Sequence, residues 1–116
     1  MREAIITRDE MLAIPASEII DLRQMPSELL VSVIVITYNQ EVYIEQTIDG
    51  ILAQHCDFPI ELIIGDDKSQ DRTLEICVNY QKRYPQIVRI VTWHENVGLN
   101  ANLLRVWGRA RGKYLS

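Results

Sequence analysis

The sequence has few of the residues that carry metal, redox or membrane functions. It contains only two cysteines, Cys56 and Cys77, with no Cys-x-x-Cys pair and no histidine at metal-ligand spacing. Zinc sites and redox dithiols are therefore not indicated, and we expect two reduced thiols in a cytoplasmic protein. No segment approaches the roughly 18 to 20 apolar residues of a membrane span. The acidic first ten residues are also unlike a secretory signal, so nothing in the sequence indicates export.

Glycine-rich phosphate loops and positive charge are also scarce. The sequence has neither G-x-x-x-x-G-K-[ST] nor G-x-G-x-x-G, which disfavours Walker-type NTPases and dinucleotide-binding enzymes. A protein that binds a nucleotide diphosphate without such a loop generally needs a metal ion or basic side chains. The net charge is −4, and the one basic cluster lies near the C-terminus, at Arg105, Arg109, Arg111 and Lys113. We therefore expect no nucleic-acid partner.

The 116 residues are 47% hydrophobic and 24% charged, which is typical of one small globular domain. Residues 1–30 differ from the rest, because short apolar pairs alternate with charges and Pro15 and Pro26 interrupt any long helix. We interpret residues 1–30 as an N-terminal arm. Within it, residues 17–25 form either one or two helical turns or an edge strand.

From Val31 onward, strand-like and helix-like segments alternate. Buried strands of a parallel sheet are predicted at 31–39 and 60–65, where the sequence is largely apolar. A third strand is predicted at 86–94, where side chains alternate between two sets. Amphipathic spacing predicts three helices between and after them, at 41–54, 69–84 and 99–111. Residues 113–116 resemble the start of a fourth strand. This order predicts an α/β fold, a Rossmann-like three-layer α/β/α sandwich with a mostly parallel sheet.

Particular residues define the faces and ends of these helices. The first helix is expected to bury Ile44, Ile48, Ile51 and Leu52, and the third to bury Leu99, Leu103, Val106, Trp107 and Ala110. Asn39 or Gln40 is expected near the N-cap of the first helix, and Ser69 at that of the second, with Asp71 in its first turn. Gly112 is the expected C-cap of the third helix.

Two of the predicted strands end in residues suited to a ligand. Tyr38 follows the first strand, and Asp66 and Asp67 follow the second, so all three lie at the carboxyl edge where such sheets bind ligands. An aromatic face and a carboxylate acceptor suit a nucleotide base, and the N3–H of uracil makes a uridine nucleotide the simplest candidate. The alternative is that Tyr38 belongs to the core and the aspartates cap the next helix.

Three segments, in this order, resemble the opening half of the family 2 glycosyltransferases of the GT-A fold. They are VSVIVITYN at 31–39, IELIIGDDKSQDRT at 60–73 and ENVGLNANLLRVWGRARGKYLS at 95–116. The resemblance implies that residues 31–116 are the nucleotide-sugar-binding half of a GT-A domain. It also implies an enzyme that transfers a sugar, with inversion, from a nucleotide-diphosphate donor such as a UDP-sugar. The acceptor would be a saccharide or lipid-linked hydroxyl in polysaccharide or glycan biosynthesis.

The resemblance assigns roles to individual residues. Thr37 and Tyr38 match positions lining the nucleoside pocket, with Tyr38 against the base, while Asp67 matches the partner of uracil N3–H and Asp66 a loop-organising carboxylate. The remaining matched nucleotide-binding positions are Asn39, Glu41, Asn96, Gly98, Asn102 and Arg105.

Three residues near this site carry more specific expectations. Gly98 is expected to allow a positive φ or a close approach of the donor. Arg105 is either a diphosphate contact or part of a solvated helix face. Lys68, where the family usually has glycine or asparagine, is expected to neutralise part of the charge of the aspartate pair.

The family's metal-binding Asp-x-Asp motif and its aspartate base would lie beyond Ser116, so the resemblance implies no catalytic or metal-ligating residue in this chain. We expect a divalent cation, Mg or Mn, in the full-length enzyme only. The chain is then a truncated half-domain that binds nucleotide but is inactive alone. Its exposed sheet edge is expected either to self-associate or to be covered by the N-terminal arm. The parent enzyme would be cytoplasmic or peripheral at the inner face of the membrane.

Two other functions are alternatives for this sequence. One is a non-catalytic nucleotide-binding or assembly module of the same fold. The other is a phospho-receiver domain, which is disfavoured because its acidic pair should follow the first strand.

Overall fold

The structure is a computed structural model that describes residues 15–20, 31–54, 60–112 and 114–115. A short strand, β1 (Ala16–Ile19), precedes a regular alternation of strands and helices. The alternating elements are β2 (Val31–Thr37), α2 (Ile44–Leu52), β3 (Ile60–Asp66), α3 (Thr73–Arg83), β4 (Val88–Trp93), α4 (Leu99–Gly108) and β5 (Tyr114–Leu115). The order of elements predicted from the sequence is thereby confirmed.

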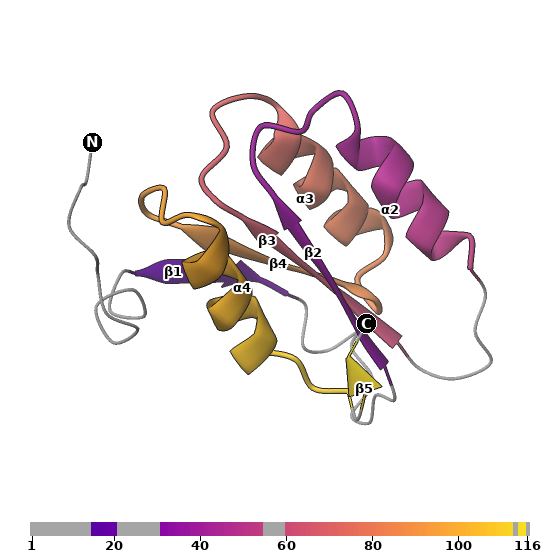
Figure 1. Cartoon of the computed structure of the whole chain (residues 1–116). Coiled ribbons are helices and arrows are strands. Elements are labelled where there is room, and N and C mark those ends of the chain that lie inside the picture. Colours follow the sequence, from indigo (N-terminus) through magenta and orange to yellow (C-terminus); the bar gives the residue numbers. More distant parts are fainter. Residues whose placement is uncertain (1–14, 21–30, 55–59, 113, 116) are drawn as a thin grey trace.

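All five strands belong to one sheet, in the order β1-β4-β3-β2-β5 (Figure 1). β2 pairs in parallel with β3 and with β5, and β3 pairs in parallel with β4, whereas β1 runs antiparallel to β4. The mostly parallel sheet is therefore confirmed. Of the two alternatives for the N-terminal segment, residues 16–19 form the edge strand, while 21–25 lie outside the described residues. The boundary between an arm and a domain at residue 30 stays a prediction.

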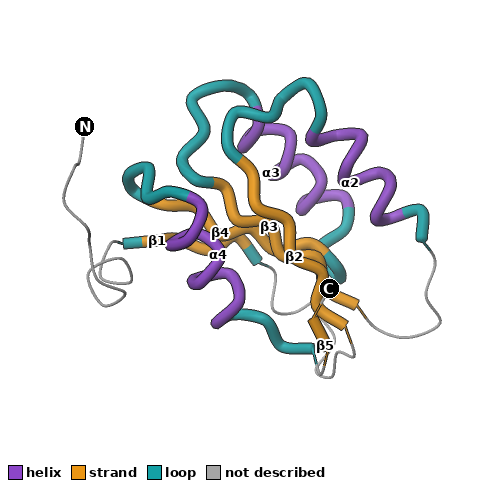
Figure 2. Tube along the Cα trace, in the orientation of Figure 1, coloured by secondary structure: helices purple, strands orange, loops and turns teal. Residues whose placement is uncertain are grey.

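Helices cover both faces of the sheet, as a three-layer sandwich requires. α2 and α3 lie together on one face and α4 lies on the other (Figure 2). The larger core lies on the α2–α3 face and is made of Ile44, Ile48, Leu62, Ile64, Cys77, Tyr80, Val88 and Ile90. A smaller core of Ile63, Val91 and Val106 lies on the α4 face. Neighbouring residues of one strand contribute to different cores because side chains alternate across a strand.

A glycine allows α4 to lie close to β3. A Cβ atom at Gly65 would stand 2.4 Å from Oδ1 of Asn102 and 2.5 Å from Cγ2 of Val106. Both distances are far below van der Waals contact, so any larger residue would push α4 away from the sheet. The position of α4 matters for function because its first turn borders the ligand edge of the sheet.

The helices are shorter than the sequence predicted, because hydrogen-bonded turns precede them. α2 begins at Ile44 rather than at residue 41, since the backbone N–H groups of Tyr43 and Ile44 both donate to the Gln40 carbonyl, at 2.9 and 2.8 Å. Neither Asn39 nor Gln40 is its N-cap, which is Tyr43. α3 begins at Thr73, and the carboxylate of Asp71, not the hydroxyl of Ser69, accepts the Thr73 N–H at 2.9 Å.

The end and the face of α4 also differ from expectation. The helix ends at Gly108 with Arg109 as its C-cap, whereas the N–H of Gly112 donates to Ser32 Oγ at 2.8 Å. Leu99 and Trp107, expected in the core, are 66% and 56% exposed. Asn102 is fully buried instead, because both the oxygen and the nitrogen of its side-chain amide have hydrogen-bond partners. It accepts from Trp93 Nε1 at 3.0 Å and donates to the Gly65 carbonyl at 2.9 Å.

Cys77 is a free thiol in the α2–α3 core, and burial raises its pKa to about 12. Its reduced state agrees with the sequence analysis, while Cys56 lies outside the described residues. No helix within the described ranges is long and apolar enough to span a bilayer.

Candidate functional site

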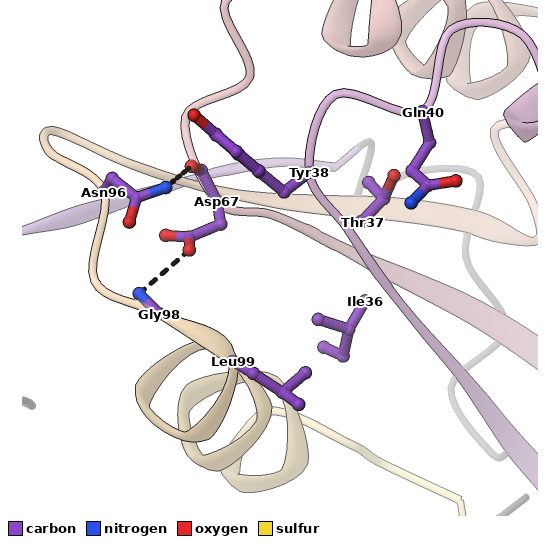
Figure 3. Close-up of a pocket in the computed structure, with 8 residues that line it drawn as sticks. All are labelled: Ile36, Thr37, Tyr38, Gln40, Asp67, Asn96, Gly98 and Leu99. Atoms are coloured by element: carbon purple, nitrogen blue, oxygen red, sulfur yellow. Dashed lines mark hydrogen bonds between the residues drawn. The ribbon is translucent and has the colours of Figure 1, made fainter.

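A pocket of about 460 Å³ opens at the carboxyl edge of the sheet (Figure 3). Small-molecule sites typically have volumes in this range. Its walls come from the end of β2, the end of β3 and the loop between β4 and α4. The lining residues are Ile36, Thr37, Tyr38, Gln40, Asp67, Asn96, Gly98 and Leu99.

The strand order explains why a crevice forms at this place. β3 and β5 flank β2 on opposite sides, and the chain leaves β2 toward α2 on one face but reaches β5 from α4 on the other. Connections that diverge to opposite faces leave a crevice at the carboxyl ends of the strands, where open α/β sheets bind their ligands.

Five of the ten residues assigned from the sequence lie together in this lining, namely Thr37, Tyr38, Asp67, Asn96 and Gly98. Tyr38 is 41% exposed, and Figure 3 shows its ring extending from the end of β2 in the direction of Asp67. The pocket thus has an aromatic ring and a carboxylate in its wall, as the ligand edge was expected to have.

Asp67 binds the loop between β4 and α4 (Figure 3). Its Oδ1 accepts the Val97 N–H at 2.7 Å and its Oδ2 accepts the Gly98 N–H at 2.9 Å. Its backbone carbonyl accepts Nδ2 of Asn96 at 3.0 Å, and the residue is only 5% exposed. A carboxylate offers about four acceptor sites. These two side-chain bonds therefore leave Asp67 able to accept a further hydrogen from a ligand.

Gly98 contributes a backbone conformation to this loop. Its φ is 89°, in the region that favours glycine, which agrees with the positive φ expected from the sequence. A Cβ at this position would meet no atom within 4 Å, so the glycine is required by the backbone angle rather than by crowding. In this conformation the consecutive N–H groups of Val97 and Gly98 both donate to one carboxylate.

Asp66 organises its own loop, the role that the sequence analysis expected. Its Oδ2 accepts the Ser69 N–H at 3.0 Å, and its Oδ1 accepts the Ser69 hydroxyl at 2.5 Å. Burial raises the pKa of Asp66, while these two bonds act in the opposite direction and the neighbouring Asp67 adds to the rise. The Asp66 carboxylate is fully buried, and the two hydrogen bonds from Ser69 offset the cost of that burial. Asp66 does not line the pocket.

Asn39 and Glu41 take part in hydrogen bonds that join the loop after β2 to the loop after β3. The Asn39 N–H donates to Ser69 Oγ at 2.9 Å, and Asn39 Oδ1 accepts the Gln70 N–H at 2.8 Å. The Glu41 N–H donates to Asp71 Oδ2 at 3.2 Å. Asn39 has φ of 50°, a region in which asparagine is several-fold enriched. These hydrogen bonds hold the loop after β2, which carries Tyr38, against the loop after β3.

Thr37 presents its hydroxyl away from Ile36 (Figure 3). Since side chains alternate along β2, Thr37 shares the α2–α3 face with Val33 and Val35, while Ile36 lies on the α4 face with Ile34. The Thr37 hydroxyl is buried and has no hydrogen-bond partner among the described residues.

Asn102, Arg105 and Lys68 act elsewhere than in the pocket lining. Asn102 lies on the face of α4 that packs against Gly65 of β3, and the guanidinium of Arg105 stacks 4.8 Å from the ring centre of Trp93. Lys68 was expected to neutralise the aspartate pair, but its ammonium donates to the His94 carbonyl at 2.9 Å. That contact ties the loop after β3 to the loop after β4.

Sequence reasoning missed three lining residues, Ile36, Gln40 and Leu99. Ile36 was assigned to a buried strand and Leu99 to the buried face of a helix. In a sequence, an apolar residue that lines a pocket cannot be distinguished from one in the core. Gln40 directly follows the ligand-edge segment Thr37–Asn39, and that proximity was the one available signal.

A cation site is not formed by the residues that the structure describes, since no three His, Cys, Asp or Glu side chains among them are placed to hold a metal ion. The groups that the pocket offers to a ligand are the ring of Tyr38, the carboxylate of Asp67 and the side-chain amides of Gln40 and Asn96.

Comparison with known sequences identifies the family of the chain that forms this pocket. The profile of Glycosyl transferase family 2 matches residues 32–116. The chain belongs to glycosyl transferase family 2. It is 46% identical over 85 residues to an uncharacterized protein of Mycobacterium tuberculosis, covering 73% of this chain and 25% of that protein. It is 38% identical over 88 residues to TuaG, a putative teichuronic acid biosynthesis glycosyltransferase of Bacillus subtilis, covering 75% and 34%.

Solved structures of glycosyltransferases share the fold. Staphylococcus aureus TarS in complex with UDP-GlcNAc aligns with a TM-score of 0.64 and 29% identity, over 75% of this chain and 25% of that one. The mannosyltransferase PcManGT of Pyrobaculum calidifontis, in complex with GDP-Man and Mn²⁺, aligns with a TM-score of 0.62 and 27% identity, over 89% and 30%. The predicted partial GT-A fold is confirmed.

The chain spans between a quarter and about a third of the lengths of the two relatives named above. What the whole enzyme transfers, and to which acceptor, is accordingly a matter of proposal.

Proposed function

We propose that the pocket binds the nucleotide of a UDP-sugar and that the parent protein is an inverting glycosyltransferase of polysaccharide or glycan biosynthesis. The observation that carries this proposal is the pairing of the exposed Tyr38 ring with the Asp67 carboxylate in one pocket wall. The UDP-GlcNAc bound by TarS supports a UDP-sugar donor. The similarity to TuaG, a putative teichuronic acid biosynthesis glycosyltransferase, supports a role in polysaccharide biosynthesis.

The two residues have complementary tasks with a uracil base. The flat face of Tyr38 provides stacking area, which is worth about 1–3 kcal/mol per base. Asp67 accepts the N3–H of uracil with the acceptor sites that Val97 and Gly98 leave unused. Because Val97 and Gly98 fix both carboxylate oxygens, the acceptor is already oriented before the base arrives, which reduces the entropy lost on binding.

Among the described residues, no three His, Cys, Asp or Glu side chains are placed together to hold a metal ion. The proposal therefore places the ligands of the divalent cation and the catalytic base in other parts of the parent protein. In this proposal the fragment binds nucleotide without catalysing transfer, and the saccharide or lipid-linked acceptor is bound by other parts of the parent protein.

Calorimetric titration of the chain with UDP and with GDP tests the proposal. We expect UDP to bind more tightly than GDP, and Tyr38→Ala to weaken UDP binding by about tenfold, since one stacked base is lost. Tyr43→Ala is the matched control, because Tyr43 is an exposed tyrosine five residues along the chain that does not line the pocket.

Each other result has a defined meaning. Tighter binding of GDP would overturn the uridine assignment, and a folded chain that binds neither nucleotide would overturn the nucleotide-binding proposal. The alternative function, a non-catalytic module of the same fold, predicts the same binding but no sugar transfer by the full-length protein.

A further inference from the structure

The N-terminal strand β1 contacts the loop that shapes one wall of the pocket. β1 runs antiparallel to β4, so its beginning lies at the carboxyl end of β4, with Ala16 paired to Trp93. The next residue, His94, donates its N–H to the Pro15 carbonyl at 3.1 Å. Its Nε2 lies 3.3 Å from Ser17 Oγ, in hydrogen-bond contact. The first residue of the β4–α4 loop is thus held from two points on the β1 segment.

The same loop continues directly into the contacts with Asp67. His94 also accepts the Lys68 ammonium on its carbonyl at 2.9 Å, and four residues later Gly98 donates to Asp67. Lys68 and Asp67 are adjacent in the sequence, so the loop is tied at both ends to the segment that follows β3. Displacement of His94 would therefore reach Val97 and Gly98 through a short, anchored stretch of chain.

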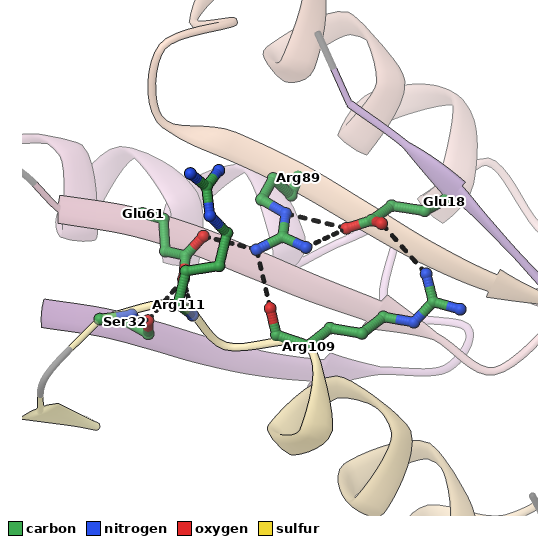
Figure 4. Close-up of polar contacts among 7 residues, drawn as sticks. Glu18, Ser32, Glu61, Arg89, Arg109 and Arg111 are labelled. Atoms are coloured by element: carbon green, nitrogen blue, oxygen red, sulfur yellow. Dashed lines mark hydrogen bonds and ion pairs between the residues drawn. The ribbon is translucent and has the colours of Figure 1, made fainter. Parts of the chain in front are cut away.

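A partly buried charge cluster fixes β1 against the sheet (Figure 4). The carboxylate of Glu18 accepts Nε of Arg89 at 2.8 Å and a second bond from Nη2 of the same guanidinium. Its other oxygen accepts Nη1 of Arg109 at 3.0 Å. Arg89 belongs to β4 and Arg109 follows α4. The side chain of Glu18 therefore binds both the strand that precedes the β4–α4 loop and the segment that follows α4.

We propose that β1 is a positioning element of the nucleotide pocket, which holds residues 94–98 in the conformation that orients Asp67. This inference rests on the proposed function, since it concerns the affinity of that pocket for a uridine diphosphate. Glu18 and Ser17 act through the loop and touch no ligand. Segment 94–98 has no helix or strand of its own, so its order depends on such anchors.

The test combines amide hydrogen exchange with UDP titration, using Glu18→Gln, Ser17→Ala and the control Glu75→Gln. In Glu18→Gln we expect the amides of Val97 and Gly98 to exchange about tenfold faster, because an ionic hydrogen bond is weakened. We expect UDP affinity to fall by a similar factor. The amide of Leu62, which donates to the Ile87 carbonyl within the sheet, should keep its exchange rate. Ser17→Ala should give a smaller change of the same kind, about twofold to threefold.

A purely structural role for β1 would accelerate exchange at Leu62 as much as at Val97 and Gly98, and that result would overturn the inference. Unchanged loop exchange and unchanged UDP affinity in both folded variants would also overturn it. If Glu18→Gln does not fold, Ser17→Ala decides the matter, because it leaves the charge cluster intact. Failure of the unaltered chain to bind UDP would instead refute the proposed function, and the exchange rates would still decide whether β1 orders the loop.

Discussion

Replacing Glu61 with glutamine is a stringent test of the polar cluster beneath α4. Glu61 lies near the start of β3, is fully buried, and accepts three hydrogen bonds (Figure 4). The donors are Nη1 of Arg89, the hydroxyl of Ser32 and the backbone N–H of Arg111, each at 2.6 Å. Glutamine has nearly the same shape, but its NH₂ group replaces one acceptor oxygen. At least one of the three donors then faces another donor.

The expected loss of stability follows from burial. Removing one partner of a buried ion pair typically costs about 3–5 kcal/mol, since the remaining charge is left in a poorly solvated site. Arg89 keeps its bonds to Glu18, so we expect the lower end of that range, about 3 kcal/mol. This is a large share of the roughly 5–15 kcal/mol by which small domains are stable.

Urea denaturation followed by tryptophan fluorescence measures this loss, because Trp93 is buried in the native fold. With a slope of about 2 kcal/mol per molar urea, the midpoint should fall by about 1.5 M. The control is Glu75→Gln, whose partner Arg72 lies 3.3 Å away with both side chains at least 60% exposed. Such a pair contributes about 0–1 kcal/mol, so its midpoint should hardly move. A loss below about 1 kcal/mol for Glu61→Gln would refute the reasoning, since the network would then not depend on the charge.

Two further substitutions test the surroundings of the pocket. Gly65→Ala should destabilise the fold by about 1–3 kcal/mol in the same urea assay, because its Cβ would meet Asn102 and Val106; an unchanged midpoint would show that α4 does not lie this close to β3. Thr37→Val should raise stability by about 1 kcal/mol, because a buried hydroxyl without a partner is replaced by a methyl group of similar size. Its thermal midpoint should therefore rise, and a fall in the midpoint would mean that the Thr37 hydroxyl has a partner in solution.

The fold could be predicted from the sequence because its signals are local and periodic. The apolar runs of β2 and β3, and the spacing of Ile44 and Ile48 in α2, each indicate an element without reference to the rest of the chain. Helix ends were predicted less accurately, since Ser69 and Gly112 match capping preferences but bond to residues outside their expected helices. Ser69 binds Asp66 and Gly112 binds Ser32, and neither partner is apparent from helix signals.

Contacts between distant segments could not be predicted in this way. Asn102 is polar and was assigned to the pocket, yet it is buried because Trp93 and Gly65 happen to present a donor and an acceptor at its site. Glu18 and Arg89 are 71 positions apart, and their pairing depends on the register of β1 on β4. A charge in an apolar segment indicates that a partner exists, but the fold alone determines which one.

The two edges of the sheet are connected through α4. The helix begins beside Gly98 in the pocket, packs with Asn102 and Val106 over Gly65, and is followed by Arg109 and Arg111 in the charge cluster. A buried ion cluster adds little net stability compared with apolar packing, but it is satisfied in only one arrangement of its donors and acceptors. Here that arrangement requires β1, β3, β4 and residues 109–112 to be in register at once. The cluster at the amino ends of the parallel strands therefore fixes the segment that follows α4, while Asp67 fixes the loop that precedes it at their carboxyl ends.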